Sequence, residues 1–238
     1  MRTEKPLEGK VALITGANRG IGLAVAHSLA ALGASLSLSA RDGNRLEAVA
    51  RELKSLTKVV TIPADLTRPA EVATIVPETE LALGPVDILV NNAGVGTFSP
   101  VQDATESDWD TMLDTNLKAV FLLTRAVAPS MIRRRAGHIV NIASLAGKNA
   151  FAGGAVYCAS KWGLLGLTQC AAEDLRAHGI RVSAVCPGSV ATDFSPHGKK
   201  DISKMLQPGD IAHAVAMIVT QAPQSFISEV LLRPTQKP

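Results

Sequence analysis

The feature that most constrains the fold is a regular alternation of short strand patterns with longer helical patterns along almost the entire chain. Strands separated in this way by helices are typical of a parallel sheet that is wrapped by helices on both faces. We therefore predict an α/β fold with one doubly wound parallel sheet of about seven strands. The predicted strands are residues 11–15, 35–39, 59–65, 86–94, 138–144, 181–188 and 228–234.

The helical patterns differ in regularity. Residues 45–56 indicate an amphipathic helix, and residues 71–83 indicate a helix made irregular by Pro77. The longest pattern, residues 107–134, contains Pro129, where we expect a bend. The other predicted helices run from the glycine-rich turn to Gly33, from the stretch around Tyr157 to about His178, and over residues 211–220.

We expect one domain over residues 1–238, because no linker, low-complexity tract or internal repeat divides the chain. A chain of 238 residues with 47% hydrophobic residues can bury one complete core. The most irregular segment, residues 193–210, is polar and rich in glycine, proline and lysine. We predict that it is a loop covering the substrate, with a mobile surface excursion as the alternative.

The stretch TGANRGIG, residues 15–22, leads from a strand into three glycines and then into a helix. Glycines permit a tight turn and bring backbone N–H groups close to a diphosphate, and the helix N-terminus adds positive potential. The stretch follows the first strand and opens the first helix, which is the context that dinucleotide binding requires. The sequence therefore predicts a Rossmann-like dinucleotide site here.

The end of the second strand indicates which dinucleotide binds. An acidic residue about twenty positions after the glycines would hold ribose hydroxyls, whereas arginines would suit a 2′-phosphate. Arg41 follows the strand and Arg19 lies in the glycine turn, so two guanidinium groups can form a fork for a phosphate. We predict NADPH/NADP⁺. The alternative is NADH, with Asp42 on the ribose and Arg41 in solvent.

The chain has one tyrosine, Tyr157, and Lys161 follows four positions later in a predicted helix. Residues i and i+4 share a helix face, so the ammonium can lie beside the phenol. A nearby cation lowers the pKa of a phenol towards working pH, which makes a usable proton donor and acceptor. The alternative is a core tyrosine and a solvent-seeking lysine that share a face by chance.

Other strand ends carry small or polar residues. Open α/β sheets place their ligands at the carboxyl ends of the strands. Ser144 ends the fifth strand, where its hydroxyl can hydrogen-bond a carbonyl oxygen that Tyr157 protonates. Residues 91–94 (NNAG) end the fourth strand and permit close backbone approach to a cofactor. Residues 187–188 (PG) end the sixth strand, and Thr192 follows within reach of the same edge.

Together these motifs resemble those of the short-chain dehydrogenase/reductase family in its compact, single-domain form. The matching motifs are TGANRGIG, NNAG, Asn116, Ser144, YCASK and PGSVAT, in the family's order over residues 15–192. The resemblance implies an NADPH-dependent oxidoreductase that reversibly reduces a ketone, an aldehyde or a 3-oxoacyl compound to an alcohol. Two other interpretations remain open, an NAD(H)-specific alcohol dehydrogenase of the same family and a non-catalytic dinucleotide-binding sensor.

The resemblance also implies a role for each matching residue. Tyr157 would be the general acid/base, and Lys161 would lower its pKa and hold the nicotinamide ribose. Ser144 would polarise the carbonyl, and Asn116 would help to hold a water relay leading to Lys161. Asp65 would face the adenine. The residues expected to contact the cofactor are Gly16, Asn18, Arg19, Gly20, Ile21, Gly22, Arg41, Asp65, Leu66, Asn92, Ala93, Gly94, Tyr157, Lys161, Pro187, Gly188, Val190 and Thr192.

The family pattern further implies that two predicted helices, 107–134 and 157–178, pair between subunits, which predicts a homodimer or homotetramer. Trp109 and Trp162 are expected to be core or interface anchors. The sequence departs from many relatives after Thr192, where the segment is shorter, and in its closing stretch SEVLLRPTQKP. The shorter segment predicts a smaller or more open substrate cover.

Composition argues against several other classes of function. A formal net charge of +3 is too small to imply nucleic acid or a membrane as the main partner. The three cysteines show no paired or metal-type spacing, and the histidines form no close ligand pair, so no metal is expected. The polar N-terminus and the short apolar runs favour a cytoplasmic protein. The expected partner is a small carbonyl or alcohol compound, apolar where it meets Phe98, Leu145, Phe151 and Phe194.

Overall fold

The computed structural model of the protein describes residues 5–194 and 201–238. At its centre is a seven-stranded sheet in the order β3-β2-β1-β4-β5-β6-β7, and all six pairings are parallel. The order reverses beside β1, so the predicted doubly wound, Rossmann-like fold is confirmed. The strands are β1 (Val11–Thr15), β2 (Ser35–Ala40), β3 (Val59–Pro63), β4 (Ile88–Asn91), β5 (Gly137–Ile142), β6 (Ile180–Pro187) and β7 (Glu229–Leu232).

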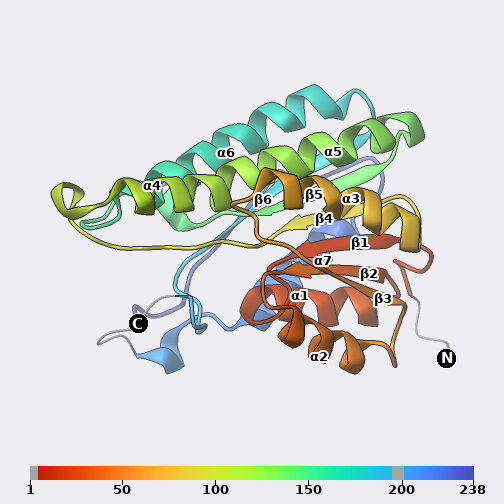
Figure 1. Ribbon diagram of the computed structural model, residues 1–238, viewed down its shortest axis with the longest axis horizontal. Helices are drawn as coiled ribbons and strands as arrows, with labels where there is room; N and C mark the ends of the chain where they lie inside the picture. Colours follow the sequence, from red (N-terminus) through yellow and green to blue (C-terminus); the bar gives the residue numbers. More distant parts are fainter. Residues whose placement is uncertain (1–4, 195–200) are drawn as a thin grey trace.

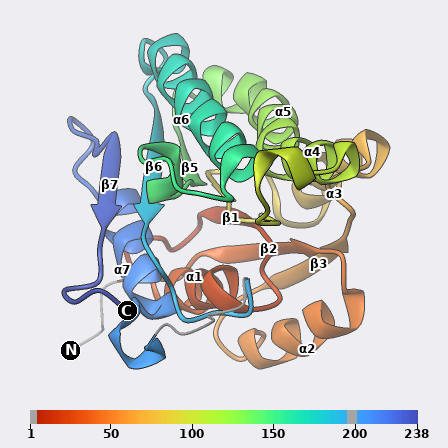
Figure 2. The same ribbon diagram turned by 90° about the vertical axis from the view of Figure 1, so that its left-hand side faces the viewer.

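Helices cover both faces of this sheet, as predicted (Figure 1). The α-helices are α1 (Gly20–Ala31), α2 (Gly43–Leu53), α3 (Pro69–Leu83), α4 (Glu106–Leu113), α5 (Ala119–Arg134), α6 (Ala155–Arg176) and α7 (Pro208–Val219). Helices α1, α2 and α7 lie on one face, while α3, α5 and α6 lie on the other (Figures 1 and 2). Short 3₁₀ turns are η1 (Val101–Asp103), η3 (Leu145–Gly147) and η4 (Ile202–Lys204).

The strands are buried on both faces, which explains their composition. All five residues of β1 are buried, as the continuous apolar run VALIT predicts for a strand between two helical layers. Strand β2 alternates serine and leucine, yet Ser37 and Ser39 are buried as well. The hydroxyl of Ser37 lies 2.6 Å from the hydroxyl of Thr79 in α3, so a helix covers the serine face of this strand. Small hydroxyl side chains thus allow α3 to pack closely on the sheet.

The long predicted helix 107–134 is interrupted at a different place from the one expected. A π-helical turn, η2 (Asp114–Lys118), joins α4 to α5, while Pro129 lies inside α5. Turns of this kind occur mostly as single insertions, frequently at functional sites. Trp109 and Trp162 are 48% and 54% exposed, so neither belongs to the core of the chain, and the interface role remains a prediction.

The loops that follow β4, β5 and β6 lie together at the left-hand end of the molecule in Figure 1, the edge that faces the viewer in Figure 2. Of the predicted covering loop 193–210, residues 195–200 lie outside the described residues. The rest is more regular than expected, because it contains η4 and its last residues open α7 at Pro208. Within residues 5–194 and 201–238, none of the helices combines the length and the apolar character that crossing a bilayer requires.

Candidate active site

A cavity of about 1020 Å³ opens along the edge formed by the carboxyl ends of the strands. Most of the residues singled out from the sequence line it, from the glycine turn to Tyr157 and Lys161. Gly22 and Asn116 are exceptions among the described residues, since both lie behind the cavity wall. The predicted residues in the wall are Gly16, Asn18, Arg19, Gly20, Ile21, Arg41, Asp65, Leu66, Asn92, Ala93, Gly94, Ser144, Tyr157, Lys161, Pro187, Gly188, Val190 and Thr192.

The glycine turn is fixed to the end of β4 by a compact set of hydrogen bonds. The Asn92 side-chain amide donates to the carbonyl oxygens of Thr15 and Gly16, at 2.9 and 3.2 Å. In return, the Thr15 hydroxyl oxygen accepts from the backbone N–H groups of Asn92 and Ala93, each at 3.1 Å. Thr15 was not among the predicted site residues, although it begins the TG pair of the motif. These contacts hold the turn in one shape.

The glycines themselves are required by this shape. Gly16 and Gly20 have φ values of 65° and 55°, in the left-handed region that favours glycine. A Cβ on Gly16 would lie 2.9 Å from the Cα of Ala93. A Cβ on Gly22 would collide with the Gly16 carbonyl and the Asn92 amide. Gly22 therefore lets helix α1 pack beneath the turn, and Gly16 lets the turn pack against the loop after β4.

The carboxyl end of β2 and the first turn of α2 bring two guanidinium groups to the cavity. Arg41 lines it as predicted, and Arg45 from the first turn of α2 lines it as well. The carboxylate of Asp42 accepts a hydrogen bond from the Arg45 backbone N–H at 3.0 Å and so caps α2. Arg19 forms an ion pair with Asp193 at 3.7 Å, which links the glycine turn to the segment after β6. Arg45 was missed because the sequence placed the start of this helix two residues late.

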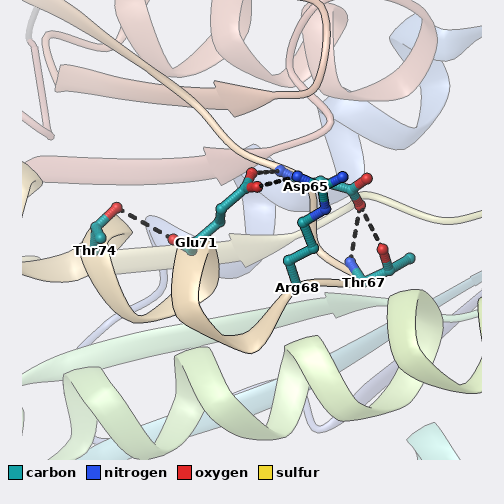
Figure 3. A network of polar contacts seen from close by, with 5 residues as sticks. All are labelled: Asp65, Thr67, Arg68, Glu71 and Thr74. Atoms are coloured by element: carbon teal, nitrogen blue, oxygen red, sulfur yellow. Dashed lines mark hydrogen bonds and ion pairs between the residues drawn. The ribbon is translucent and has the colours of Figure 1, made fainter.

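The loop after β3 is held by the polar network drawn in Figure 3. One Asp65 carboxylate oxygen accepts from the backbone N–H and the hydroxyl of Thr67, at 3.0 and 2.9 Å. These hydrogen bonds, with a smaller contribution from Arg41, lower the pKa of Asp65 below its usual value. The backbone N–H of Asp65 donates to Glu71 at 2.7 Å, and Glu71 also pairs with Arg68. Asp65 is thus ionised and fixed at the cavity wall.

Tyr157 and Lys161 share one face of α6, as predicted, and both are buried. The Lys161 ammonium donates to the Ile142 carbonyl at 3.0 Å and lies 5.8 Å from the centroid of the Tyr157 ring. Burial lowers the pKa of Lys161 to about 8 and raises the pKa of Tyr157 to about 12. The pKa of the phenol is thus above its usual value in this structure, and a lowering of that pKa by Lys161 stays a prediction. Desolvation outweighs the hydrogen bond from Ser144, and Tyr157 is held in its protonated form.

Ser144 lies where β5 gives way to η3. Its hydroxyl oxygen accepts from the Ala146 backbone N–H at 3.1 Å, which orients the side chain as the cap of this turn. A hydrogen bond between Ser144 and Tyr157 opposes the effect of burial on the pKa of Tyr157. The two hydroxyl groups, predicted from separate motifs, thus meet at one point of the cavity.

Asn116 lies in the π-helical turn and joins the loop after β4 to α6. Its side-chain oxygen accepts from the Val95 N–H, and its amide donates to the Val95 carbonyl, both at 2.9 Å. The same amide donates to the Ser160 hydroxyl at 3.0 Å, and that hydroxyl donates to the Tyr157 carbonyl at 2.8 Å. Asn116 thus holds Gly94, on the cavity wall, and the Tyr157 turn of α6 at a fixed distance.

Two further parts of the wall come from distant segments. Phe98 and Phe194 pack against the Tyr157 ring, and Phe151 packs against Phe98. The stretch after β7, residues 233–238, closes another part of the wall, and Pro234 approaches Gly188. Nothing in the local pattern of this stretch indicated that it returns to the site.

The residues present fit a dinucleotide. The left-handed glycines leave a cradle beside the N-terminus of α1, and a Cβ on Gly94 would lie 3.7 Å from the Lys161 ammonium. Arg19, Arg41 and Arg45 line the cavity beside the ends of β1 and β2, and Ser144 and Tyr157 line it on the other side of β4, after β5 and in α6. By contrast, no group of three or more histidine, cysteine, aspartate or glutamate side chains in the described part of the chain is arranged to hold a metal ion.

The fold and this cavity together define a Rossmann-like oxidoreductase of the class that uses a nicotinamide dinucleotide. Residues 10–202 match the family model described as short chain dehydrogenase. The chain therefore belongs to the short-chain dehydrogenase/reductase family, as its motifs indicated.

Similar proteins include an uncharacterised oxidoreductase of Staphylococcus saprophyticus, 36% identical over 96% of this chain and 98% of its own length. A metagenomic short-chain oxidoreductase, solved in complex with NADP, is 48% identical and superimposes with a TM-score of 0.87, covering 98% of this chain and 100% of its own. An alcohol dehydrogenase of the archaeon Thermococcus sibiricus, complexed with 5-hydroxy-NADP, is 30% identical with a TM-score of 0.88, over 96% and 98% of the two chains.

Proposed function

We propose that the protein is an NADPH-dependent carbonyl reductase that converts a ketone or aldehyde reversibly to an alcohol. The observation that carries this proposal is the hydrogen-bonded Ser144–Tyr157 pair with buried Lys161, at one end of a cavity whose other end carries arginines. Both similar solved structures named above hold NADP or a derivative of it, which supports this choice of cofactor.

The proposed cofactor site uses two sets of residues. The turn from Gly16 to Gly20 and the first N–H groups of α1 would hold the diphosphate. Arg41 and Arg45 would hold the 2′-phosphate. Arg19 would also reach it if its exposed ion pair with Asp193 breaks when the cofactor binds. The cap that Asp42 provides for α2 commits its carboxylate to the backbone and disfavours the NADH alternative, in which it would bind ribose.

In the proposed reaction, the hydride for the carbonyl carbon would come from NADPH when it is bound. The protein residues supply the rest. Ser144 donates a hydrogen bond to the carbonyl oxygen, and Tyr157 donates the proton that completes the alcohol. The raised pKa of Tyr157 suits this direction, because burial keeps the phenol protonated until the oxygen develops charge. Lys161, charged below pH about 8, stabilises the tyrosinate left behind.

Asn116 and Asn92 act in this proposal as positioning residues. Asn92 keeps the glycine turn against β4, and Asn116 keeps the loop after β4 against the turn of α6 that carries Tyr157. The segment after β6 is proposed to cover the substrate, since Asp193 and Phe194 already line the cavity.

The test is the loss of NADPH absorbance with a panel of ketones, aldehydes, diketones and β-ketoacyl thioesters. Wild type should turn over at least one substrate, and Tyr157→Phe should be at least about 100-fold slower, because a positioned general acid contributes roughly that much or more. Both proteins should bind NADPH with equal affinity in calorimetry. Equal turnover by the two would contradict the proposed mechanism. NADPH binding without turnover of any carbonyl would favour the non-catalytic sensor instead.

A further inference from the structure

Aromatic side chains are scarce in this chain, yet they gather at one end of the cavity. Three of the five phenylalanines and the single tyrosine meet there, although they come from the loops after β4, β5 and β6 and from α6. The ring centroids of Phe98 and Tyr157 are 5.4 Å apart in an edge-to-face arrangement. Phe151 lies 5.9 Å from Phe98, and Phe194 lies 5.8 Å from Tyr157. These separations are those of interacting aromatic pairs.

The phenylalanine rings pack against glycine residues. A Cβ on Gly96 would lie 2.9 Å from the Phe194 ring and 3.0 Å from the Phe98 ring. A Cβ on Gly154 would lie 2.6 Å from the Phe151 ring. Each ring therefore packs directly on glycine backbone, closer to that backbone than a side chain there would allow.

The rings remain open to the cavity. Phe98, Phe151 and Phe194 are 40%, 48% and 38% exposed, whereas Tyr157 between them is buried. Exposed apolar surface gathered in a concave site is typical of a ligand-binding groove. The apolar area that the three rings leave uncovered lies beside the phenol that would donate the proton.

The part of the wall formed by the loops after β4 and β5 is uncharged, whereas Asp193, Arg233 and Lys237 line the cavity from the segments after β6 and β7. Among the described residues, the lining side chains from 92–98 and 142–151 are all uncharged. Lys148, the one cation within those stretches, is paired with Glu229 at 2.9 Å and is not part of the wall. An anionic substituent packed against Phe98 and Phe151 would thus meet apolar rings and lose its hydration.

We propose that the substrate is an uncharged ketone whose reacting carbonyl carries an aryl group, and that Phe98, Phe151 and Phe194 are the residues that select it. This inference rests on the proposed function. The aryl group packs against the three rings while the carbonyl oxygen reaches Ser144 and Tyr157. The hydride goes to the carbonyl carbon and the Tyr157 proton to its oxygen, so that NADPH is oxidised as the ketone becomes a secondary alcohol.

The test compares acetophenone with 2,3-butanedione, a small reactive diketone that needs no aryl contact. In Phe98→Ala and Phe151→Ala, the ratio of kcat/KM for acetophenone to that for butanedione should fall about tenfold or more, as expected when several apolar carbons leave a pocket. Gly96→Ala should lower the same ratio by displacing two rings at once. Phe98→Leu keeps the site apolar but removes one ring. In this variant the kcat/KM for cyclohexyl methyl ketone should fall less than the kcat/KM for acetophenone. Wild type should favour acetophenone over the anionic 4-acetylbenzoate.

Phe121→Ala is the matched control. Phe121 is 44% exposed on α5, with the Arg125 guanidinium 5.3 Å over its ring, and it is not part of the cavity wall. The substrate ratio should stay within twofold in this variant. A ratio compares two substrates in one preparation, so a general loss of folded protein does not change it.

The outcomes separate this inference from the proposed function. An unchanged ratio in the phenylalanine variants, or a preference for 4-acetylbenzoate, would overturn the inference while Tyr157-dependent reduction of butanedione upholds the function. If no carbonyl is reduced, calorimetry of 1-phenylethanol with the protein–NADP⁺ complex decides. Binding that is lost in Phe98→Ala would support the aromatic site and contradict only the function, whereas no binding would overturn the inference too.

Discussion

The two ends of the cavity are held by different forces. At the dinucleotide end, directional hydrogen bonds fix each element, such as those between Asn92, Thr15 and the glycine turn. At the phenylalanine end, three exposed rings rest on glycines, and the loops after β4 and β5 are joined by the backbone hydrogen bond from Ser99 to Gly153 at 3.0 Å. Hydrogen bonds impose one geometry, whereas apolar packing is non-directional. The dinucleotide end is therefore held in a single shape, whereas the phenylalanine end can adapt its shape.

The largest expected effect is that of Ser144→Ala, which should lower kcat without changing the dinucleotide end of the cavity. Removing one donor to a developing oxyanion costs about 100- to 1000-fold in kcat. NADPH affinity should stay within twofold, because the dinucleotide end keeps all its hydrogen bonds. Stopped-flow kinetics and calorimetry on the same preparation measure both quantities. A parallel loss of cofactor affinity would show that the two ends are not independent.

Gly22→Ala should disrupt the packing of the glycine turn at the dinucleotide end and so destabilise the protein. The new Cβ would collide with backbone at Gly16, which cannot move without breaking the contacts of Asn92. We expect the free energy of unfolding in urea to fall by about 3 kcal/mol, the upper part of the usual range for overpacking.

Gly166→Ala is its control, because Gly166 lies inside α6 with nothing within 4 Å of a new Cβ. This substitution should leave the stability unchanged or raise it by up to about 1 kcal/mol, as glycine is a poor helix former. If both variants lost the same stability, the close packing beneath the turn would not be the cause.

Arg41→Ala tests whether the dinucleotide end discriminates NADPH from NADH. Losing a hydrogen bond to a charged group costs about 1.5–3 kcal/mol, so the Kd for NADPH should rise by roughly 10- to 100-fold. The Kd for NADH, which lacks the 2′-phosphate, should hardly change. Arg51→Ala, an exposed arginine in the last turn of α2, is the matched control and should affect neither Kd. Equal weakening of both cofactors by Arg41→Ala would argue for the NADH alternative.

The smallest predicted effect is a pH dependence at the junction of the two ends. Lys161 carries its charge below its pKa of about 8 and loses it as the pH rises. Tyr157, with a pKa of about 12, stays protonated over this range. The kcat/KM for NADPH, which reports groups of the free protein, should therefore be level below pH about 8 and fall about tenfold per unit above it.

Lys161→Arg should remove this fall, since a guanidinium stays charged, even if its overall rate is lower. A fall of the same midpoint in that variant would assign the titration to another group.

Local patterns in the sequence were enough for the architecture and for the placement of Tyr157 and Lys161 at the cavity. The alternation of strands and helices gave the parallel sheet, and the position of TGANRGIG located the turn before α1. The i, i+4 spacing placed Tyr157 and Lys161 on one face of α6. Each of these inferences depends on residues close together in the chain, whose geometry is set by the backbone period.

The interruption of the long helix was mispredicted for the same reason. Pro129 is a strong local signal, yet the structure accommodates it inside α5 and inserts the π-helical turn at Asp114–Lys118 instead. That turn carries Asn116, whose partners Val95 and Ser160 lie far away in the sequence. Tertiary contacts decided its place. The cap that Asp42 gives α2, by contrast, was available from the sequence, because aspartate before a helical pattern is a usual N-cap.

The sequence by itself thus determined the sheet, the glycine turn and the shared helix face of Tyr157 and Lys161, the pair proposed to transfer the proton. Only the tertiary structure decided the protonation of that pair, because the pKa of Tyr157 depends on how completely other segments bury it. It also decided how the rings of Phe98, Phe151 and Phe194, expected near the substrate, pack on one another and on Tyr157, since they lie on three loops separated by whole crossover units. Burial and convergence are properties of the closed chain, in which distant residues share one volume, and no local pattern contains them.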